Sequence, residues 1–256
     1  MKLFFIVLAK DGRFVEEKVT RLKNINVPYV VVCGEKLNLP HVVYRKPVGK
    51  YDAINFGIRF IPKDVDIIIF NDVDTKIYRF NAALACLERE KADLVFTKVV
   101  IREGPQILFN LFLDAIRRWI LITANGELIL IRHEVLDEVL PLKSCKAEDT
   151  YILFKILELG YKAIFCEECF VETERTKSIE KEEMYKRKTV AGIYQALSYT
   201  KPPRDIRLFY ILLPLISPLL LFLGRKGHYW IKGILHGLLD YLRGDRSGFW
   251  QTTYME

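Results

Sequence analysis

Short apolar runs alternate with helix-like stretches along the first two thirds of the chain. The runs consist mainly of Val, Ile, Leu and Phe, which is typical of strands buried on both faces, and they fall at residues 3–9, 28–33, 41–44, 65–70, 93–101, 127–132 and 161–166. Apolar residues at helical spacing predict helices at 13–24, 49–61, 80–91, 105–122 and 148–159. This alternation predicts an α/β fold with a mainly parallel sheet and helices on both faces.

The pattern changes near residue 200, so we expect a catalytic domain over residues 1–200 and membrane-associating helices over 201–256. Residues 208–224 are 17 residues without a charge. As a straight helix they would extend about 25 Å, which is less than the hydrocarbon core of about 30 Å. Pro214 and Pro218 weaken such a helix further. This run therefore does not by itself predict a straight transmembrane span.

The stretch that follows has the spacing of an amphipathic helix. Its apolar face holds Ile231, Ile234, Leu235, Leu238, Leu239 and Leu242, and its polar face holds Lys232, His236, Asp240 and Arg243. Tyr229 and Trp230 are residue types that suit a bilayer interface. We expect this helix to lie on a membrane surface; the alternative is a helix pair packed on the catalytic domain.

Charge and cysteine content point to the same compartment. The formal net charge is +7, and residues 201–256 hold eight Lys or Arg against four Asp or Glu. Because this basic segment is so apolar, it suits an anionic membrane surface and not nucleic acid. The N-terminus has no signal-peptide pattern, and five cysteines, an odd number, suit a reducing compartment. We expect the catalytic domain in the cytoplasm, at the cytoplasmic face of the cell membrane.

Two aspartates, Asp72 and Asp74, follow the apolar run at 65–70. In a parallel sheet, ligands bind beyond the carboxyl ends of the strands. Mg²⁺ and Mn²⁺ prefer carboxylate oxygens and keep positions open for water and phosphate. The pair therefore indicates a metal site, although two carboxylates one residue apart also occur by chance in polar loops.

Two helix starts offer further candidates. Gly49 and Lys50 open one predicted helix, where backbone N–H groups and a mobile cation favour an anion. Glu148 and Asp149 open another, where a general base could be held rigidly. Taken singly, each is equally explained by a solvated helix start or by acids that complement the helix dipole.

In this order the motifs resemble those of glycosyltransferase family two, the inverting sugar transferases with a GT-A fold, a Rossmann-like α/β sheet. The resemblance covers about residues 1–195 and is closest to lipid-acceptor members such as dolichyl-phosphate mannose synthases. It rests on Gly49-Lys50 with Ala53, Asn55 and Gly57, on Asp72 and Asp74, on Asn125-Gly126-Glu127 before a strand, and on Glu148-Asp149 followed by Gly160-Tyr161.

The resemblance implies roles for individual residues. Asp74 would ligate Mn²⁺ or Mg²⁺ at the donor diphosphate, and Asp72 would touch the ribose or share the metal. Asp149 would be the base that deprotonates the acceptor hydroxyl. The remaining donor-side residues would be Ala9, Glu35, Lys50, Arg187 and Lys188, and Glu148 and Gly126 would lie on the acceptor side.

The sequence also departs from the family pattern. The Asp-Asp-Gly-Ser-like turn of many relatives that use UDP-sugars is replaced by residues 32–36, Val-Cys-Gly-Glu-Lys. Glu35 could accept from a guanine or uracil N–H there, or belong to a plain surface loop. The Q-x-x-R-W stretch of processive members has Thr189 in place of Trp, which favours a single transfer. The densely charged residues 172–183 predict a mobile surface loop.

We therefore expect a membrane-associated, metal-dependent inverting hexosyltransferase. It would use a nucleotide-sugar donor, GDP-mannose in preference to UDP-glucose, and a lipid-linked acceptor, with no nucleic-acid partner. A sugar-nucleotide-forming nucleotidyltransferase is one alternative, but it would need a Gly-rich loop after the first strand, where only Gly12 stands. A non-catalytic membrane adaptor is another, and it would be expected to lack Asp74 or Asp149.

Overall fold

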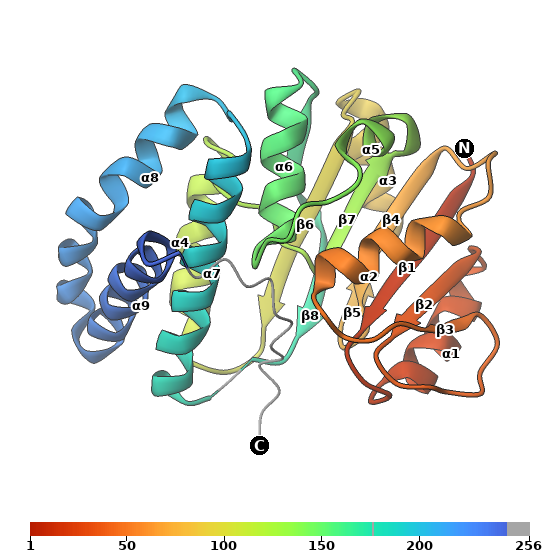
Figure 1. The fold of residues 1–256 in the computed structure, drawn as a ribbon, viewed down its shortest axis with the longest axis horizontal. Helices are drawn as coiled ribbons and strands as arrows, with labels where there is room; N and C mark the ends of the chain where they lie inside the picture. Colours follow the sequence, from red (N-terminus) through yellow and green to blue (C-terminus); the bar gives the residue numbers. More distant parts are fainter. Residues whose placement is uncertain (176, 245–256) are drawn as a thin grey trace.

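The computed structural model describes residues 1–175 and 177–244, which form a sheet flanked by helices (Figure 1). In this part of the chain the sheet has eight strands in the order β3-β2-β1-β4-β7-β6-β8-β5. The strands are β1 Leu3–Ala9, β2 Tyr29–Cys33, β3 Val42–Tyr44, β4 Ile67–Asp72, β5 Lys76–Tyr78, β6 Leu94–Ile101, β7 Leu128–Arg132 and β8 Ala163–Thr173. β7 is antiparallel to β4 and β6, and β5 is antiparallel to β8. The other four pairings among these strands are parallel, so the predicted α/β fold is confirmed, with a mixed sheet in which parallel pairs are the majority.

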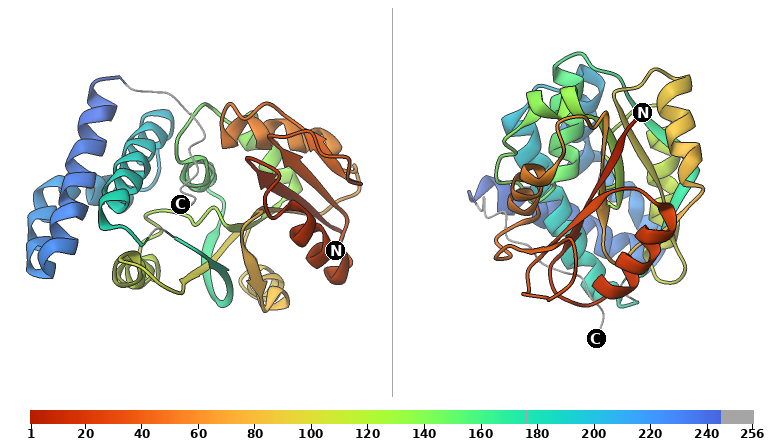
Figure 2. Two further views of the ribbon diagram at one scale, coloured as in Figure 1. Left: turned by 90° about the horizontal axis from the view of Figure 1, so that it is seen from below. Right: turned by 90° about the vertical axis from the view of Figure 1, so that its right-hand side faces the viewer.

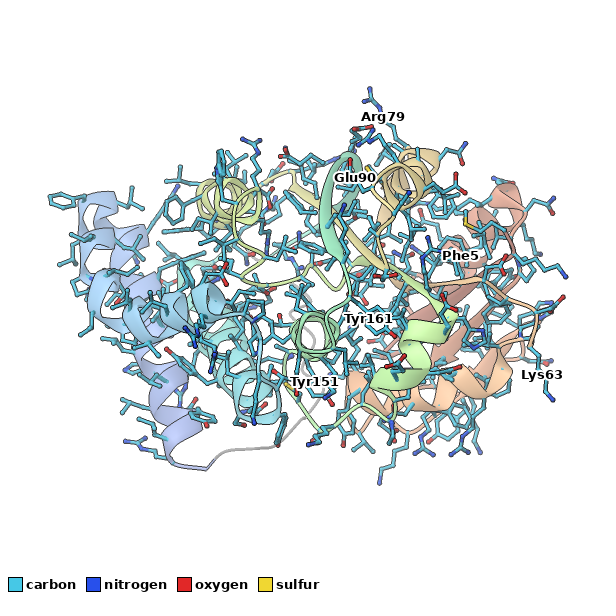
Figure 3. All side chains as sticks on the ribbon, turned by 90° about the horizontal axis from the view of Figure 1, so that it is seen from above. Phe5, Lys63, Arg79, Glu90, Tyr151 and Tyr161 are labelled. Carbon is cyan, nitrogen blue, oxygen red and sulfur yellow. The ribbon has the colours of Figure 1, made fainter. Side chains whose placement is uncertain are left out.

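Helices cover both faces of this sheet. On one face, α1 (Val15–Ile25) and α3 (Phe80–Arg89) share a core with the strands. On the other lie α2 (Lys50–Gly57) with the 3-10 turn η1 (Ile58–Phe60), α5 (His133–Val139) and α6 (Glu148–Glu158). Figure 3 shows Tyr151 on α6, while Lys63, Arg79 and Glu90 lie toward the outside of the layers.

The strand pattern explains the two cores. Successive side chains of a strand point to opposite faces, so Phe5 and Val7 of β1 enter one core while Ile6 and Leu8 enter the other. Each fully buried side chain of this size contributes roughly 1.5–3 kcal/mol to folding. A continuous apolar run therefore contributes side chains to the cores on both faces of the sheet.

Most predicted elements are present, with shifted ends. The helix predicted at 105–122 ends earlier, as α4 (Gln106–Arg117). The strand predicted at 161–166 continues to Thr173, pairing in parallel with β6 past a register shift. The short β5 and α5 had no counterpart in the prediction.

The predicted loop at residues 172–183 was wrong. Glu172 and Thr173 complete β8, and α7 (Ile179–Tyr199) begins with a Ser178 hydroxyl that accepts a hydrogen bond from the Lys181 backbone N–H. The charges of this run are not all solvated, because Glu182 is only 1% exposed. Local composition did not reveal this burial, which depends on packing against distant helices.

Three further helical elements follow α7 on the side of the sheet away from β3 (Figures 1 and 2). They are α8 (Arg204–Ile216), the 3-10 turn η2 (Ser217–Leu223) and α9 (Gly224–Leu242). α9 packs along α7 through glycines: a Cβ at Gly237 would lie 2.6 Å from the Arg187 carbonyl oxygen. The beginning of α8 also joins the core, since Tyr210 donates a hydrogen bond to the Ile122 carbonyl at 2.7 Å.

The predicted apolar face of α9 is divided by this packing. Ile234 is buried, whereas Leu239 and Leu242 are exposed. Trp230, expected at a bilayer interface, is instead 6% exposed and stacks on Phe109 of α4 with ring centroids 3.6 Å apart. This part of the prediction was wrong because α4 and α7 supply a protein surface that covers the ring.

A large apolar surface nevertheless remains on α8 and η2. Leu215 is 74% exposed and Phe222 is 90% exposed. Among the described residues, the helical run Arg204–Leu242 is the one with the length and apolar composition that a membrane crossing requires. These two properties are weak evidence for a span, and the run is interrupted by η2, so α8 and α9 are separate segments (Figure 1).

Candidate active site

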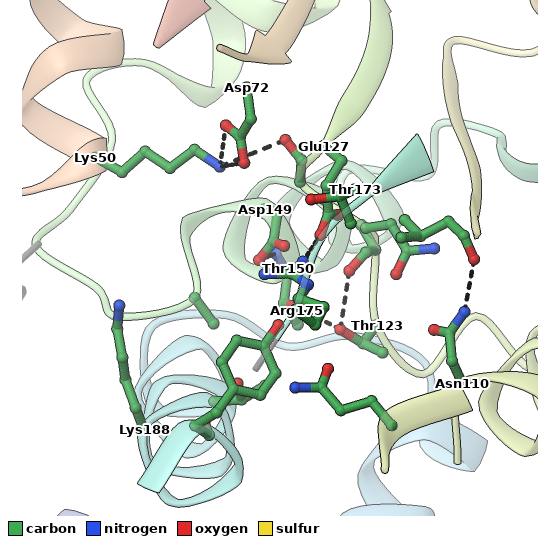
Figure 4. A pocket seen from close by; sticks show the side chains of 18 of the residues that line it. Lys50, Asp72, Asn110, Thr123, Glu127, Asp149, Thr150, Thr173, Arg175 and Lys188 are labelled. Carbon is green, nitrogen blue, oxygen red and sulfur yellow. Dashed lines mark hydrogen bonds and ion pairs between the residues drawn. The ribbon is translucent and has the colours of Figure 1, made fainter. Parts of the chain in front are cut away.

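A cavity of about 600 Å³ opens where the parallel strands end (Figure 4). Its strand end, as we name it, is lined by Lys50, Asp72, Asp74, Gly126 and Asp149. Its helix end is lined by Gln106 of α4, Glu182 and Lys186 of α7, and Trp230 and Ile234 of α9. The cavity thus joins the sheet to helices that follow much later in the chain.

The aspartate pair lies at the end of β4, where Asp72 is the last residue of the strand and Asp74 belongs to the turn that follows. The Thr75 hydroxyl donates to the Asp72 carbonyl at 2.8 Å, and Asn71 Nδ2 donates to that hydroxyl at 2.9 Å. The Lys18 ammonium of α1 donates a hydrogen bond to the Thr75 carbonyl at 2.8 Å. Burial of Asp74 and the nearby Asp72 carboxylate raise the pKa of Asp74. The turn therefore holds concentrated negative charge in a fixed place.

Lys50 occupies the centre of the strand end. Its ammonium lies 2.7 Å from Asp72 Oδ1, 3.3 Å from Glu148 Oε1 and 3.4 Å from the Gly126 carbonyl. Burial alone would lower the pKa of Lys50, but the carboxylates of Asp72, Glu148 and Asp149 outweigh it and raise the pKa. Lys50 is therefore a permanent cation in this site.

Glu148 and Asp149 enter the cavity from the first turn of α6. Burial raises the pKa of Asp149 against the opposing effect of Lys50, and it raises the pKa of Glu148 to about 7. Asp149 Oδ1 accepts a hydrogen bond from the Thr150 backbone N–H at 2.6 Å. A Cβ at Gly126 would lie 2.8 Å from Asp149 Oδ2, so a larger residue here would displace this carboxylate. Asp149 is thus a fixed carboxylate of raised basicity.

The residues at this turn fit a divalent cation of the Mg²⁺ or Mn²⁺ type. The described part of the chain contains no group of three or more His, Cys, Asp or Glu side chains arranged to hold a metal ion. Asp72 and Asp74 are two hard oxygen donors beside open space, and these ions commonly take few protein ligands and complete their shell with water and phosphate.

The other predicted donor residues fall into two groups. Lys188 of α7 reaches the cavity, and burial lowers the pKa of its ammonium. Ala9 is fully buried at the end of β1 and does not line the cavity. Glu35 is exposed and accepts from the Gly12 backbone N–H at 2.9 Å outside the cavity, and Arg187 faces away to pair with Asp240 of α9 at 2.6 Å.

Two charged residues of the cavity, Arg175 and Lys18, were missed from the sequence. Arg175 pairs with Glu127 beside the aspartate turn, and it lies within the charged run that we interpreted as a loop. Lys18 is 3% exposed, and burial lowers the pKa of its ammonium to about 7. Its position in the apolar stripe of α1, next to Val19, was the signal that could have identified it.

Comparisons with known proteins agree with this architecture. No family model and no curated protein matches the sequence. Among solved structures, a mannosyltransferase, PcManGT from Pyrobaculum calidifontis in complex with GDP-Man and Mn²⁺, superposes with a TM-score of 0.71 at 15% identity, over 93% of this chain and 86% of that one. The chain has a GT-A fold.

Two further solved structures support the same fold. GalNAc-T7 with UDP, GalNAc and Mn²⁺ has a TM-score of 0.55 at 11% identity, over 97% of this chain and 58% of that one. S. aureus TarS, residues 1–349, has a TM-score of 0.52 at 12% identity, over 95% of this chain and 92% of that one. Because the sequence identities are this low, the comparisons are evidence for the fold alone. Evidence for the chemistry comes from the residues that line the cavity.

Proposed function

We propose that this protein is a metal-dependent glycosyltransferase that moves a single hexose from a nucleotide-sugar donor to a lipid-linked acceptor, with inversion at the anomeric carbon. The observation that carries the proposal is the convergence of Lys50, Asp72, Asp74 and Asp149 at the strand end of one cavity. GT-A folds of known glycosyltransferases supply the context.

Each group has a place in such a reaction. Asp74, with Asp72, would hold Mn²⁺ or Mg²⁺, which when bound neutralises charge on a diphosphate leaving group. Lys50 and Lys188 are cations that can contact the phosphates. Asp149 accepts the proton of the attacking hydroxyl, and its raised pKa brings it closer to the operating pH of a general base.

GDP-mannose is the donor we favour, followed by UDP-glucose. The usual turn of UDP-sugar relatives is absent, and one structure of the same fold was solved with GDP-Man. Glu35 remains the candidate for contact with the base, although it lies beside the cavity and not within it. A donor that reaches from the aspartate turn toward the end of β2 would meet this side chain.

The assay that tests the reaction uses purified protein, Mn²⁺ and either donor. We expect metal-dependent release of GDP or UDP that is abolished by EDTA. Release of pyrophosphate from a nucleoside triphosphate and a sugar phosphate would identify a nucleotidyltransferase instead. A protein with neither activity and no nucleotide binding would contradict the proposal.

Association with the cytoplasmic face of the cell membrane is the second part of the proposal. The exposed apolar surface of α8 and η2 is bordered by the basic Arg204, Arg207, Arg225 and Lys226, a combination that suits anionic lipid. All five cysteines lie in the described residues and are free, as expected for a reducing compartment. An acceptor in the membrane would then lie close to the cavity.

Flotation with anionic liposomes tests this part. The double variant Leu215→Glu and Phe222→Glu should lose most of its binding, since both side chains are exposed and apolar. Tyr44→Glu is the matched control, because Tyr44 is also exposed but lies on β3 at the far edge of the sheet. Equal flotation of the double variant and the control would refute membrane attachment through α8 and η2.

A further inference from the structure

Helix α4 turns its polar side toward the protein and its apolar side outward. The structure describes every residue of this helix, and its polar residues Gln106, Asn110, Asp114 and Arg117 are buried or half-buried. Its exposed residues are all apolar: Ile107, Leu108, Leu111, Phe112 and Ala115. A helix that packs on a protein in water normally shows the opposite arrangement, with its polar side in solvent. The outer side of α4 therefore suits an apolar surrounding.

The polar residues of α4 are used inside the molecule. Arg117 forms an ion pair with Asp114 at 2.8 Å, and Asn110 donates a hydrogen bond to the Val99 carbonyl at 2.7 Å. Gln106, Asn110 and Arg117 also line the cavity. These interactions fix the rotation of the helix, so its exposed apolar side chains cannot turn inward without breaking them.

The exposed residues of α4 form one stripe along the helix. Positions 107, 108, 111, 112 and 115 have the spacing of a single helix face. Trp119 follows the helix and is 88% exposed. With 12 residues, α4 extends over about 18 Å, which is less than the bilayer hydrocarbon core of about 30 Å. This length suits a helix that lies along a surface and does not cross it.

α4 is a neighbour of the helices that carry the other exposed apolar surface. Leu113 of α4 and Phe209 and Leu213 of α8 line the same cavity. Phe109 of α4 stacks on Trp230 of α9, the helix that begins directly after η2. Figure 2 shows these helices at the outside of the molecule. The apolar stripe of α4 thus adds to the surface of α8 and η2.

The chemistry of the stripe indicates lipid and not a protein partner. Protein interfaces contain about one hydrogen bond per 100–200 Å², but none of the exposed side chains of α4 can donate or accept one. Acyl chains need no such partner. The exposed charged residues Arg102 and Arg118 lie near the two ends of the stripe, where long side chains can reach lipid headgroups. Trp119 at one end is a residue type that suits the bilayer interface.

We propose that α4 lies in the boundary region of a bilayer, with its outer side among the acyl chains, as a membrane-contacting element in addition to α8 and η2. The membrane then meets helices that wall the helix end of the cavity. This inference rests on the proposed membrane association and deepens it by naming a contact that precedes the C-terminal helices in the chain.

Trp119 provides a direct reporter of this contact. In the variant Trp230→Phe/Trp250→Phe it is the remaining tryptophan, and the phenylalanine at position 230 keeps an aromatic ring against Phe109. The probe is a vesicle of phosphatidylglycerol and phosphatidylcholine, the latter brominated in its acyl chains. We expect Trp119 emission to shift to shorter wavelength and to be quenched by the brominated lipid.

Three results in this experiment would overturn the inference. One is unquenched Trp119 emission in protein that floats with the vesicles. Another is a blue shift that appears without vesicles as the protein concentration rises, which would identify a second copy of the chain as the partner. The third is failure of the protein to float, which would refute the proposed membrane association as well.

The double variant Leu111→Glu/Phe112→Glu tests the stripe itself. Because it places two charges among the acyl chains, we expect the vesicle partition coefficient to fall roughly tenfold or more. Tyr44→Glu/Phe60→Glu is the matched control, since both side chains are exposed but lie on β3 and η1. Melting temperatures of both variants show whether the fold is kept.

Equal partition of the stripe variant and the control would refute the contact through α4. If Leu215→Glu/Phe222→Glu still lost binding, attachment through α8 and η2 would stand without it. Nucleotide binding with Mn²⁺ should be unchanged in the stripe variant by calorimetry. Failure of the parent to bind GDP or UDP would refute the proposed glycosyltransferase function separately.

Discussion

The two ends of the cavity differ in how their charges are compensated. At the strand end, the Lys50 ammonium forms ion pairs with Asp72 and Glu148, so these charged groups hold one another in position. At the helix end, Glu182 is buried, and Lys186, Trp230 and Gln106 stabilise its charged form. A preorganised charged cluster suits chemistry, because it need not reorganise during reaction, whereas a buried carboxylate that interacts with side chains of three helices fixes the packing of those helices.

The largest effect should come from the strand end. Asp149→Asn removes the proposed base but keeps the size of the side chain, so we expect sugar transfer to fall by about 10³-fold. Nucleotide affinity should remain within about twofold of the parent. The measurement is release of nucleoside diphosphate in the presence of acceptor. Full activity in this variant would show that Asp149 is not the base and that the strand end is not where the proton is removed.

Gly126→Ala should give the next largest effect. The added Cβ would lie 2.8 Å from Asp149 Oδ2 and 3.2 Å from Lys50 Nζ, so both groups must move. A displacement of about 1 Å at a reacting group can cost about 10²-fold in rate. We expect that loss in kcat/KM with little change in melting temperature. An active variant would show that the strand end tolerates looser geometry.

A substitution in the contact between α7 and α9, next to the helix end, should affect folding more than donor binding. In Gly237→Ala the new Cβ would lie 2.6 Å from the Arg187 carbonyl oxygen and 2.8 Å from Val190 Cβ, so α9 must shift from α7. We expect a loss of about 1–3 kcal/mol in the free energy of unfolding, as for other overpacked sites. Leu235→Ala on the exposed side of α9 serves as control in urea unfolding, and equal stability of the two variants would contradict this packing.

The smallest expected effect is a change in the pH dependence of stability. The pKa of Glu148 is raised by burial to about 7, so the folded state holds its proton where the unfolded state releases it. The stabilisation is complete below the ordinary pKa of about 4.5 and is lost as the pH rises through about 7. The melting temperature of the parent should therefore fall between pH 5 and pH 8 by about 5 °C more than that of Glu148→Gln. Parallel curves for the two proteins would exclude this contribution.

The sequence predicted the strand end much better than the helix end. Asp72 and Asp149 stand directly after a strand and at the start of a helix, so local pattern and sheet topology suffice to bring them to one edge. Gln106, Glu182 and Trp230 are separated by 76 and 48 positions in the numbering and meet through helix packing. No local pattern encodes that meeting, and the charged run around Glu182 pointed to a solvated loop.

The difference between local sequence pattern and packing between distant residues also explains which predictions for the C-terminal region succeeded. The apolar periodicity of α9 correctly indicated a helix, but it did not say which apolar residues face protein and which remain exposed. Gly233 and Gly237 allow α9 to approach α7 closely, and that approach buries Trp230 while leaving Leu239 outside. The close approach depends on residues of α7 about 50 positions earlier, which a local pattern does not contain.

The measurement that tests the central claim most directly is calorimetric titration of GDP and UDP, with and without Mn²⁺, into the parent protein and Asp74→Asn. The account predicts that Mn²⁺ strengthens binding of at least one nucleotide to the parent by at least tenfold. It also predicts that the variant, which keeps Lys50, binds with the weaker metal-free affinity in both conditions. Equal enhancement by Mn²⁺ in parent and variant, or no nucleotide binding by the parent, would contradict a metal-assisted donor site at the strand end.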